Sequence, residues 1–259
     1  MIELADSHCH IDFPDYEAEP AEIIQRAREF DVRYMLNISV CLEDFPQVLA
    51  VAEMDPQIRA TVGVHPNYDG VEEPTAERLV ELAQSSDQVV GLGETGLDFF
   101  RHKVEPAVQE TRFRAHIEAG RQLGLPLIVH SRQAREETLA LVKEASDAGV
   151  VGVMHCFAED WETAKRAMDL GFYIYFSGIV TFKNAPELRE VARKMPRDRM
   201  LVETDSPYLA PEPNRGKTNQ PGYVRYTAER IAEERGESLE ELAAATTENF
   251  LRLFAIPQA

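Results

Sequence analysis

Short apolar runs alternate along the chain with longer polar segments in which apolar residues recur at helical spacing. Several runs are apolar at consecutive positions, such as 127–129 and 200–202, as expected of strands covered on both faces. The predicted strands are Ile2–His8, Arg33–Ser39, Arg59–Val64, Gln88–Gly93, Pro126–His130, Val150–Met154, Phe172–Phe176 and Arg199–Glu203. Helices are predicted between them, as at Ala21–Phe30, Val108–Leu123, Glu136–Ala148 and Trp161–Leu170, and a ninth helical segment runs from Tyr223 to Phe254.

A strand followed by a helix, repeated eight times, predicts parallel strands joined by right-handed crossovers. The chain has 259 residues, and a (β/α)8 barrel usually needs about 250. The predicted fold class is therefore α/β, a TIM barrel spanning residues 1–259 as a single domain. A doubly wound open sheet is the structural alternative.

Composition and charge narrow the class of protein. The chain is 44% hydrophobic and 28% charged, which excludes a disordered protein, and it has no apolar run long enough for a membrane span. The first residues lack the pattern of a signal peptide, and the three cysteines form no CxxC motif, so a cytoplasmic location is expected. The net charge of −18 argues against a broad nucleic-acid-binding surface but permits phosphate binding at one metal-charged site.

Candidate metal ligands fall at the ends of the predicted strands. Five of the seven histidines stand at or just past these ends, and two carboxylates hold the same place after strands four and eight. Because the carboxyl ends of barrel strands share one mouth, these side chains are expected to converge there. They are His8, His10, His65, His130, His155, Glu94 and Asp205.

The spacing of His8 and His10 predicts two imidazoles on the same face of a strand, able to bind one metal ion. Polar strand residues without a ligand role are the alternative. Four histidines and two carboxylates exceed the needs of one tetrahedral ion, so a binuclear site is predicted. Glu94 would bridge two divalent ions. One ion would take His8, His10 and Asp205, and the other His130 and His155.

Other polar residues receive supporting roles. Asp205 is the candidate general base, since it can accept a proton from water; a simple rim carboxylate is the alternative. Glu203 is predicted to orient a metal ligand. Asp6, in phase with His8, would either do the same or form a buried structural hydrogen bond. His116 is expected to be structural, and His102 to lie in a solvated loop.

Basic residues follow several strands and would either be ordinary surface charges or meet substrate phosphates. They are Arg101, Lys103, Arg132, Arg135, Lys183, Arg215 and Lys217. A G-x-G-x-x-G pattern at 91–96 matches the dinucleotide fingerprint, but it places Glu94 where a pyrophosphate would lie and no helix follows at once. We therefore expect no nucleotide cofactor.

An ordered set of motifs resembles the TatD family of metal-dependent deoxyribonucleases. The motifs are Asp6-Ser-His-Cys-His10, Gly63-Val-His-Pro66, Gly93-Glu-Thr-Gly-Leu-Asp98, His130-Ser-Arg132, His155-Cys-Phe157 and Glu203-Thr-Asp-Ser-Pro-Tyr-Leu209. Two segments, 176–182 and 215–219, resemble the YcfH-type branch in particular. The resemblance implies an amidohydrolase-like TIM barrel, a divalent-metal site, hydrolysis of DNA as a 3′→5′ exonuclease, and a place for His65 near the substrate phosphate.

The main functional prediction is a metal-dependent phosphodiesterase acting on DNA, either single strands or chain ends. Arg132, Arg215 and Lys217 would contact its phosphates together with His65. The alternative is a hydrolase of amide or ester bonds in a small molecule or an aminoacyl ester, and a non-enzymatic metal-binding scaffold is a third possibility. Magnesium, manganese and zinc all suit the ligand set. No membrane partner is expected, and the pattern selects neither a monomer nor a homo-oligomer.

Overall fold

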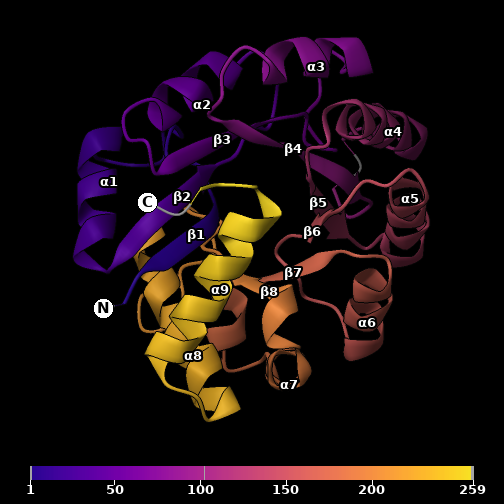
Figure 1. Cartoon of the computed structure of the whole chain (residues 1–259). Helices are drawn as coiled ribbons and strands as arrows, with labels where there is room; N and C mark the ends of the chain where they lie inside the picture. The colour runs from indigo at the N-terminus through magenta and orange to yellow at the C-terminus, as the bar shows by residue number, and fades with distance from the viewer. Residues whose placement is uncertain (1, 102, 258–259) are drawn as a thin grey trace.

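The computed structural model describes residues 2–101 and 103–257; His102 lies outside the described residues. Figure 1 shows a ring of strands surrounded by helices, with the chain passing once around the ring from indigo to orange. The strands are β1 (Leu4–Cys9), β2 (Val32–Asn37), β3 (Ile58–Val62), β4 (Val89–Asp98), β5 (Leu127–Arg132), β6 (Gly152–Met154), β7 (Tyr173–Phe176) and β8 (Met200–Val202).

All eight strands are parallel, and each pairs with its neighbour in the sequence. The ring closes where the chain beyond β8 meets β1. The amide of His10 donates to the carbonyl of Ser206, and the amide of Asp205 donates to the carbonyl of His8, both at 2.9 Å. Cys9 and Ser206 form a parallel bridge at the same place. The predicted (β/α)8 barrel is therefore confirmed, and the open sheet is excluded.

Helices on the outside return the chain from the end of one strand to the start of the next (Figure 1). They are α1 (Pro20–Glu29), α2 (Phe45–Ala52), α3 (Ala76–Ala83), α4 (Pro106–Leu123), α5 (Arg135–Asp147), α6 (Trp161–Asp169), α7 (Pro186–Lys194), α8 (Val224–Arg235) and α9 (Leu239–Leu253). Short 3-10 turns add η1 (Gly178–Thr181), η2 (Arg197–Arg199) and η3 (Pro221–Tyr223). No helix in the described chain combines the length and the apolar character that crossing a membrane requires.

The C-terminal helical segment differs from the prediction because it forms two helices. Gly236 ends α8 with a φ of 66°, a left-handed conformation that glycine adopts without strain. Two residues later the side chain of Ser238 accepts a hydrogen bond from the amide of Glu241 and starts α9. The break lets α9 turn across the end of the barrel.

The amino end of the barrel is closed by α9, which crosses in front of β1 and β8 in Figure 1. Its Phe250 and Phe254 join the apolar side chains that fill the barrel interior. Its Asn249 side chain donates to the carbonyl of Met200 at 2.8 Å, where β8 begins. The carboxyl end is therefore left to carry the polar site.

Strand β4 is longer than predicted and ends at Asp98. Between Leu92 and Thr95 it advances three residues while β5 advances two, which defines a β-bulge. Glu94 lies within this bulge, so it belongs to β4 instead of following the strand as the sequence suggested. An extra residue re-aims the side chains around it, because the simple alternation between the two faces is broken there.

The contact between β4 and β5 depends on Gly96. Its φ is 137°, and an added Cβ would lie 2.0 Å from the carbonyl oxygen of His130. Gly124, at the end of α4, also has a positive φ of 68°, but a Cβ there would meet no atom within 4 Å.

We expect Gly124→Ala to lower the free energy of unfolding by about 1–2 kcal/mol, the cost of a left-handed conformation for an L-residue. Gly96→Ala should lower it further, because the new methyl group also pushes β5 away from β4. Urea unfolding of the two variants beside the unsubstituted protein measures both effects. Equal losses would mean that the packing of β4 on β5 does not require glycine.

Candidate metal centre

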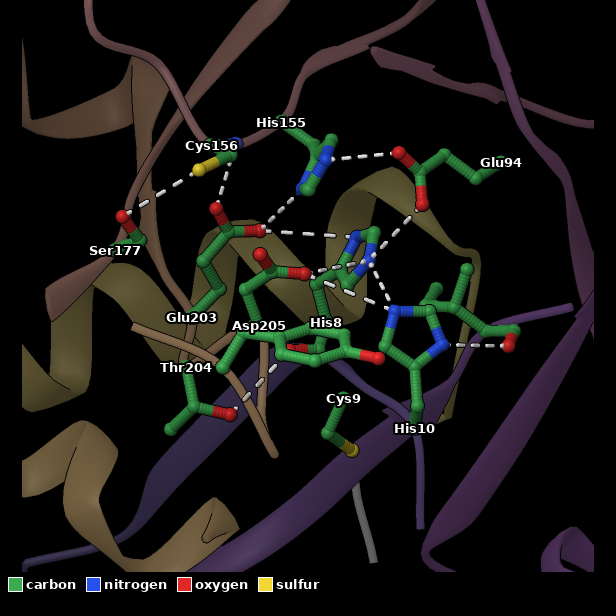
Figure 2. A network of polar contacts seen from close by, with 12 residues as sticks. His8, Cys9, His10, Glu94, His155, Cys156, Ser177, Glu203, Thr204 and Asp205 are labelled. Carbon is green, nitrogen blue, oxygen red and sulfur yellow. Dashed lines mark hydrogen bonds and ion pairs between the residues drawn. The ribbon is translucent and has the colours of Figure 1, made fainter. Parts of the chain in front are cut away.

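Six polar side chains meet at the carboxyl end of the barrel, and Figure 2 shows five of them. His8 lies in β1, Glu94 in β4 and His130 in β5, whereas His10, His155 and Asp205 follow β1, β6 and β8. Three groups of ligand atoms, each lying within 4.8 Å of one another, are His8–His10–Glu94, Glu94–His130–His155 and His8–His155–Asp205. The structure thus brings together the six residues predicted as ligands, in clusters that could hold metal ions.

A bulge in β1 sets the direction of its histidines. From Asp6 to Cys9 the strand advances three residues while β2 advances two. Strict alternation would point Asp6 and His8 in the same direction, but the extra residue breaks this alternation. The two carboxylate oxygens of Asp6 accept hydrogen bonds from the amide and the hydroxyl of Thr204, at 2.9 and 2.6 Å. Of the two roles considered for Asp6, these contacts favour the buried structural hydrogen bond.

Glu94 faces two different sets of imidazoles with its two oxygens. Its Oε2 lies 3.5 Å from Nε2 of His8. Its Oε1 lies 2.9 Å from Nδ1 of His130 and 3.0 Å from Nε2 of His155. Burial alone would raise the pKa of Glu94, but the charges of His155 and His65 and the bonds from His130 and His155 hold it well below its usual value. Glu94 is therefore ionised between the two sets.

Asp205 approaches the same cluster from the loop after β8. Its Oδ1 lies 3.5 Å from Nε2 of His8 and 3.7 Å from Nε2 of His10. Its side chain is 17% exposed, whereas that of Glu94 is 4% exposed. Although burial would raise its pKa, the bond from His10 and the charges of His155 and His8 lower it. Asp205 is thus the more accessible carboxylate, and it is ionised.

The outer nitrogen of three imidazoles meets an acceptor behind the cluster. Nδ1 of His10 lies 3.0 Å from the carbonyl of Ile38. Nδ1 of His155 lies 3.2 Å from Glu203, and Nε2 of His130 lies 3.3 Å from Asp98. An acceptor at one nitrogen keeps a proton there and leaves the other nitrogen free to bind a metal ion. Glu203 makes the contact expected of an orienting residue, and Asp98 makes an equivalent one that the sequence analysis missed.

The charge balance of the cluster fits divalent cations. Within the described chain, the ion-pair partners of Glu94, Glu203 and Asp205 are all histidines, and none is a lysine or arginine. Although burial would lower the pKa of His155, the charges of Glu94 and Glu203 raise it well above its usual value. Without a metal, this imidazole supplies part of the positive charge that the carboxylates require. Imidazole and carboxylate together are ligands for zinc, manganese or magnesium.

His65 lies beside the cluster, as predicted. Its Nδ1 accepts a hydrogen bond from the amide of Asn67 at 3.1 Å, so the proton of the neutral ring sits on Nε2, which lies 3.7 Å from Glu94. Helix α4 holds the loop after β3, which carries His65, in place. The buried guanidinium of Arg112 donates to the carbonyl of Tyr68 at 2.8 Å and forms a two-point ion pair with Glu73.

The three basic residues predicted to bind substrate lie on the rim, outside the cluster. Arg132, which ends β5, covers the ring of Phe100 with its guanidinium carbon 3.9 Å from the ring centre. Arg215 covers Phe182 in the same way at 3.8 Å. Lys217 follows in the same exposed loop. All three residues are exposed, and the guanidinium of Arg215 also donates to the carbonyl of Ala210 at 2.9 Å.

Aromatic residues near the cluster also escaped the sequence analysis. Phe13 stacks on the imidazole of His10 with the ring centres 4.4 Å apart. Tyr68 lies 5.8 Å from His65, and Tyr208 lies 6.3 Å from Phe13. Tyr208 lies within the 203–209 motif, but no local pattern marks Phe13 or Tyr68, because loops far apart in the sequence bring the three rings together. Asp98, in contrast, ends a motif that begins at Gly93 and could have been found there.

His116 supports the strand that leads to His65. It is buried in α4, where its Nε2 accepts a hydrogen bond from the amide of Val64 at 3.2 Å and its Nδ1 donates to the carbonyl of Arg112 at 2.7 Å. Burial lowers its pKa to about 4. Both of its ring nitrogens thus bond to the backbone, which agrees with the structural role expected for His116.

We expect His116 to make the fold sensitive to acid. Because its folded pKa is about 4 and its unfolded value is 6.5, stability from the neutral ring is complete above pH 6.5 and declines as the pH falls to about 4. The loss should reach up to about 3 kcal/mol. Glutamine keeps an acceptor for Val64 but does not titrate, so His116→Gln should show a smaller decline. Urea unfolding of both proteins at several pH values measures the difference, and parallel curves would contradict the prediction.

Comparison with known proteins agrees with this geometry. The family model described as TatD related DNase matches residues 5–255. The chain is 46% identical to the uncharacterized metal-dependent hydrolase YcfH of Escherichia coli (strain K12), over 98% of this chain and 96% of the relative. It is 32% identical to the 3′-5′ ssDNA/RNA exonuclease TatD of Salmonella typhimurium, over 91% and 92% of the two chains. The crystal structure of the TatD homolog YJJV from Escherichia coli matches with a TM-score of 0.90 at 28% identity, over 98% of each chain. The chain therefore belongs to the TatD-related DNase family and is a metal-dependent hydrolase of the YcfH type.

Proposed function

We propose that this hydrolase cleaves phosphodiester bonds in DNA, at single strands or chain ends, as a 3′→5′ exonuclease with two divalent metal ions. The observation that carries the proposal is the distribution of unpaired positive charge around the mouth. The name of the Salmonella exonuclease supports the choice of a nucleic acid and the polarity. We also propose a cytoplasmic location, which the three free cysteines support.

Cations on the helices and cations at the mouth differ in their partners. In the described chain, every lysine and arginine of the α-helices lies within 4.0 Å of a carboxylate oxygen. This group includes Arg135, one of the seven basic residues considered as phosphate contacts. Because it pairs with Asp160, we no longer count it among them. The remaining six of that set make no ion pair with the described residues: Arg101, Lys103, Arg132, Lys183, Arg215 and Lys217.

Unpaired cations around a cluster of buried carboxylates favour a substrate that brings its own negative charge. A phosphodiester fits both features, because its phosphate can meet the metal ions while neighbouring phosphates meet the rim cations. A neutral amide or ester would leave these cations without a partner. The rim therefore favours phosphodiester hydrolysis over the carbonyl chemistry considered as its alternative.

The arrangement of Glu94 supports two metal positions. Its Oε2 faces His8, and the ligand nitrogens of His8 and His10 and Oδ1 of Asp205 lie within 3.7 Å of one another. Its Oε1 faces His130 and His155. A carboxylate with one oxygen toward each set is suited to bridging two ions. Zinc, manganese and magnesium are the candidate ions.

Divalent ions bound here would supply Lewis acidity, polarising a phosphoryl oxygen and lowering the pKa of water. Asp205 is placed to accept the proton of the attacking water, since it is ionised and the most accessible of the carboxylates near the cluster. The water oxygen forms a new bond to phosphorus as the bond from phosphorus to the leaving sugar oxygen breaks. The leaving oxygen then takes up a proton, so one water is consumed for each bond cleaved. The Nε2–H of His65 points toward the same space and can donate to a phosphoryl oxygen.

Asp205→Asn tests the proposed base. The change is nearly isosteric and keeps an oxygen near the metal ions, but the amide cannot accept a proton. We expect turnover of end-labelled single-stranded DNA to fall by about 10²–10⁴-fold, with little change in stability or metal content. Asp69→Asn, which changes an exposed carboxylate in the loop that follows His65, is the matched control and should keep full activity. Undiminished turnover in a metal-loaded Asp205→Asn protein would remove Asp205 from the mechanism.

Arg215→Ala combined with Lys217→Ala tests the phosphate contacts. Each phosphate contact contributes about −0.7 to the slope of log affinity against log salt for single strands. The double variant should bind single-stranded DNA more weakly and show a flatter slope, with its metal content unchanged. Arg193→Ala combined with Lys194→Ala removes the same charge from α7, where both cations are ion-paired, and should leave the slope unaltered.

Glu94→Ala is the control for a contaminating nuclease in both assays. If wild type and Glu94→Ala protein degrade DNA equally, the activity does not belong to this site. Metal-dependent cleavage of an amide or ester by the wild type alone would then favour the alternative chemistry.

A further inference from the structure

A cavity of about 480 Å³ opens beside the cluster of candidate metal ligands. Its volume lies within the range of about 300–1,000 Å³ that is typical of small-molecule pockets. The loops after β1, β2, β3 and β8 contribute its walls. Three aromatic and three acidic side chains dominate the lining: Phe13, Tyr68, Tyr208, Asp12, Asp15 and Asp44.

This cavity, named here the aromatic groove, is continuous with the cluster. Phe13 stacks on the ring of His10 at 4.4 Å, and the amide of Tyr208 donates to the carbonyl of Asp205 at 2.9 Å. Tyr68 comes three residues after His65, and the two rings lie 5.8 Å apart. A substrate group held in the groove therefore adjoins the position of the reacting phosphate.

The charge of the groove is opposite to that of the rest of the mouth. No lysine or arginine lines it, and its three aspartates form no ion pair with the described residues. Asp12 accepts a hydrogen bond from the side-chain amide of Asn37 at 2.8 Å, and Asp44 accepts one from the thiol of Cys41 at 3.1 Å. The unpaired cations follow β4, β5, β7 and β8 instead. The mouth thus has one side that attracts phosphate and one side that repels it.

A nucleoside matches the groove. Any base offers a π-face for stacking on aromatic side chains. The exocyclic amino groups of cytosine, adenine and guanine can donate to aspartate. Among the lining residues, a phosphate would meet three carboxylates and no lysine or arginine.

We propose that the aromatic groove binds the terminal nucleoside of a DNA strand and selects strands whose terminal sugar carries a hydroxyl instead of a phosphate. The proposal rests on the proposed phosphodiesterase function and adds the recognition of the strand end. The rest of the strand leaves over the cationic side of the mouth. Because the carboxylates of the groove repel a further phosphate, cleavage is confined to the last bond, which accounts for action at chain ends.

The test compares two single-stranded DNA 12-mers as substrates of the metal-loaded protein. Both end in deoxycytidine, and they differ only in carrying a 3′-hydroxyl or a 3′-phosphate. We expect the hydroxyl-ended strand to be shortened about tenfold faster or more, a factor equivalent to about 1.4 kcal/mol. Asp15→Asn combined with Asp44→Asn should reduce this preference, because the groove loses two negative charges. Both aspartates are exposed, so the substitutions should not disturb folding.

Tyr208→Ala tests the stacking contact. The ring is 49% exposed, so its removal should not affect folding. The KM for the hydroxyl-ended strand should rise about ten- to a hundredfold, as for the loss of one base–aromatic stack, with a smaller change in kcat. Tyr208→Phe keeps the ring and should behave as the wild type.

The outcomes separate the two proposals. Cleavage of both strands at equal rates, with an unchanged KM in Tyr208→Ala, would overturn the role of the groove and leave the phosphodiesterase function standing. Cleavage of neither strand would overturn the phosphodiesterase function, and the proposed occupant of the groove with it. A preference for the hydroxyl end that disappears in the aspartate double variant would support both.

Discussion

Three carboxylates at one end of the barrel, two of them buried and none with a lysine or arginine partner in the described chain, impose the main constraint on this molecule. Glu94, Glu203 and Asp205 lie together at the carboxyl end of the barrel, and their ion-pair partners in the described chain are all histidines. Burial of unpaired negative charge is costly, so protons on imidazoles or metal cations must balance it. Metal ions bound at such a barrel end would stabilise it. Each histidine would then need one nitrogen directed toward the metal and the other toward an acceptor behind the ring.

The backbone provides that alignment through two irregular strands. Both β1 and β4 carry a bulge close to their ligands. The chain just after β3 also lies very close to β4: a Cβ added at Gly63 would lie 2.5 Å from the Cα of Gly93. Such contacts leave the backbone around Glu94 little freedom to shift. The acceptors behind the rings, including Asp98 and Glu203, then fix the orientation of each imidazole.

The two ends of the barrel divide stability and chemistry between them. At the amino end, α9 inserts Phe250 and Phe254 and completes the apolar filling of the barrel. At the carboxyl end, the loops are free to differ in charge, and they do so by position around the ring. The unpaired cations lie at or after the ends of the later strands. The acidic and aromatic residues of the groove follow β1, β2 and β3, except for Tyr208, which follows β8. A substrate with a charged part and an uncharged end would have one orientation in such a mouth.

The repeating pattern of apolar runs and helices was sufficient to favour the barrel over an open sheet, because each strand–helix unit is a local property and eight such units are the number that a barrel needs. It also predicted that the six candidate ligands would lie together, since residues at the carboxyl ends of parallel strands converge whatever the loops do. Alternation could not predict the direction of Asp6 or the place of Glu94 within β4. A bulge depends on how two strands pair, so the pattern of residues within one strand does not predict it. The acceptors behind the imidazoles and the aromatic groove were likewise decided by tertiary structure alone, because Phe13, Tyr68 and Tyr208 become neighbours only when the ring closes between β8 and β1.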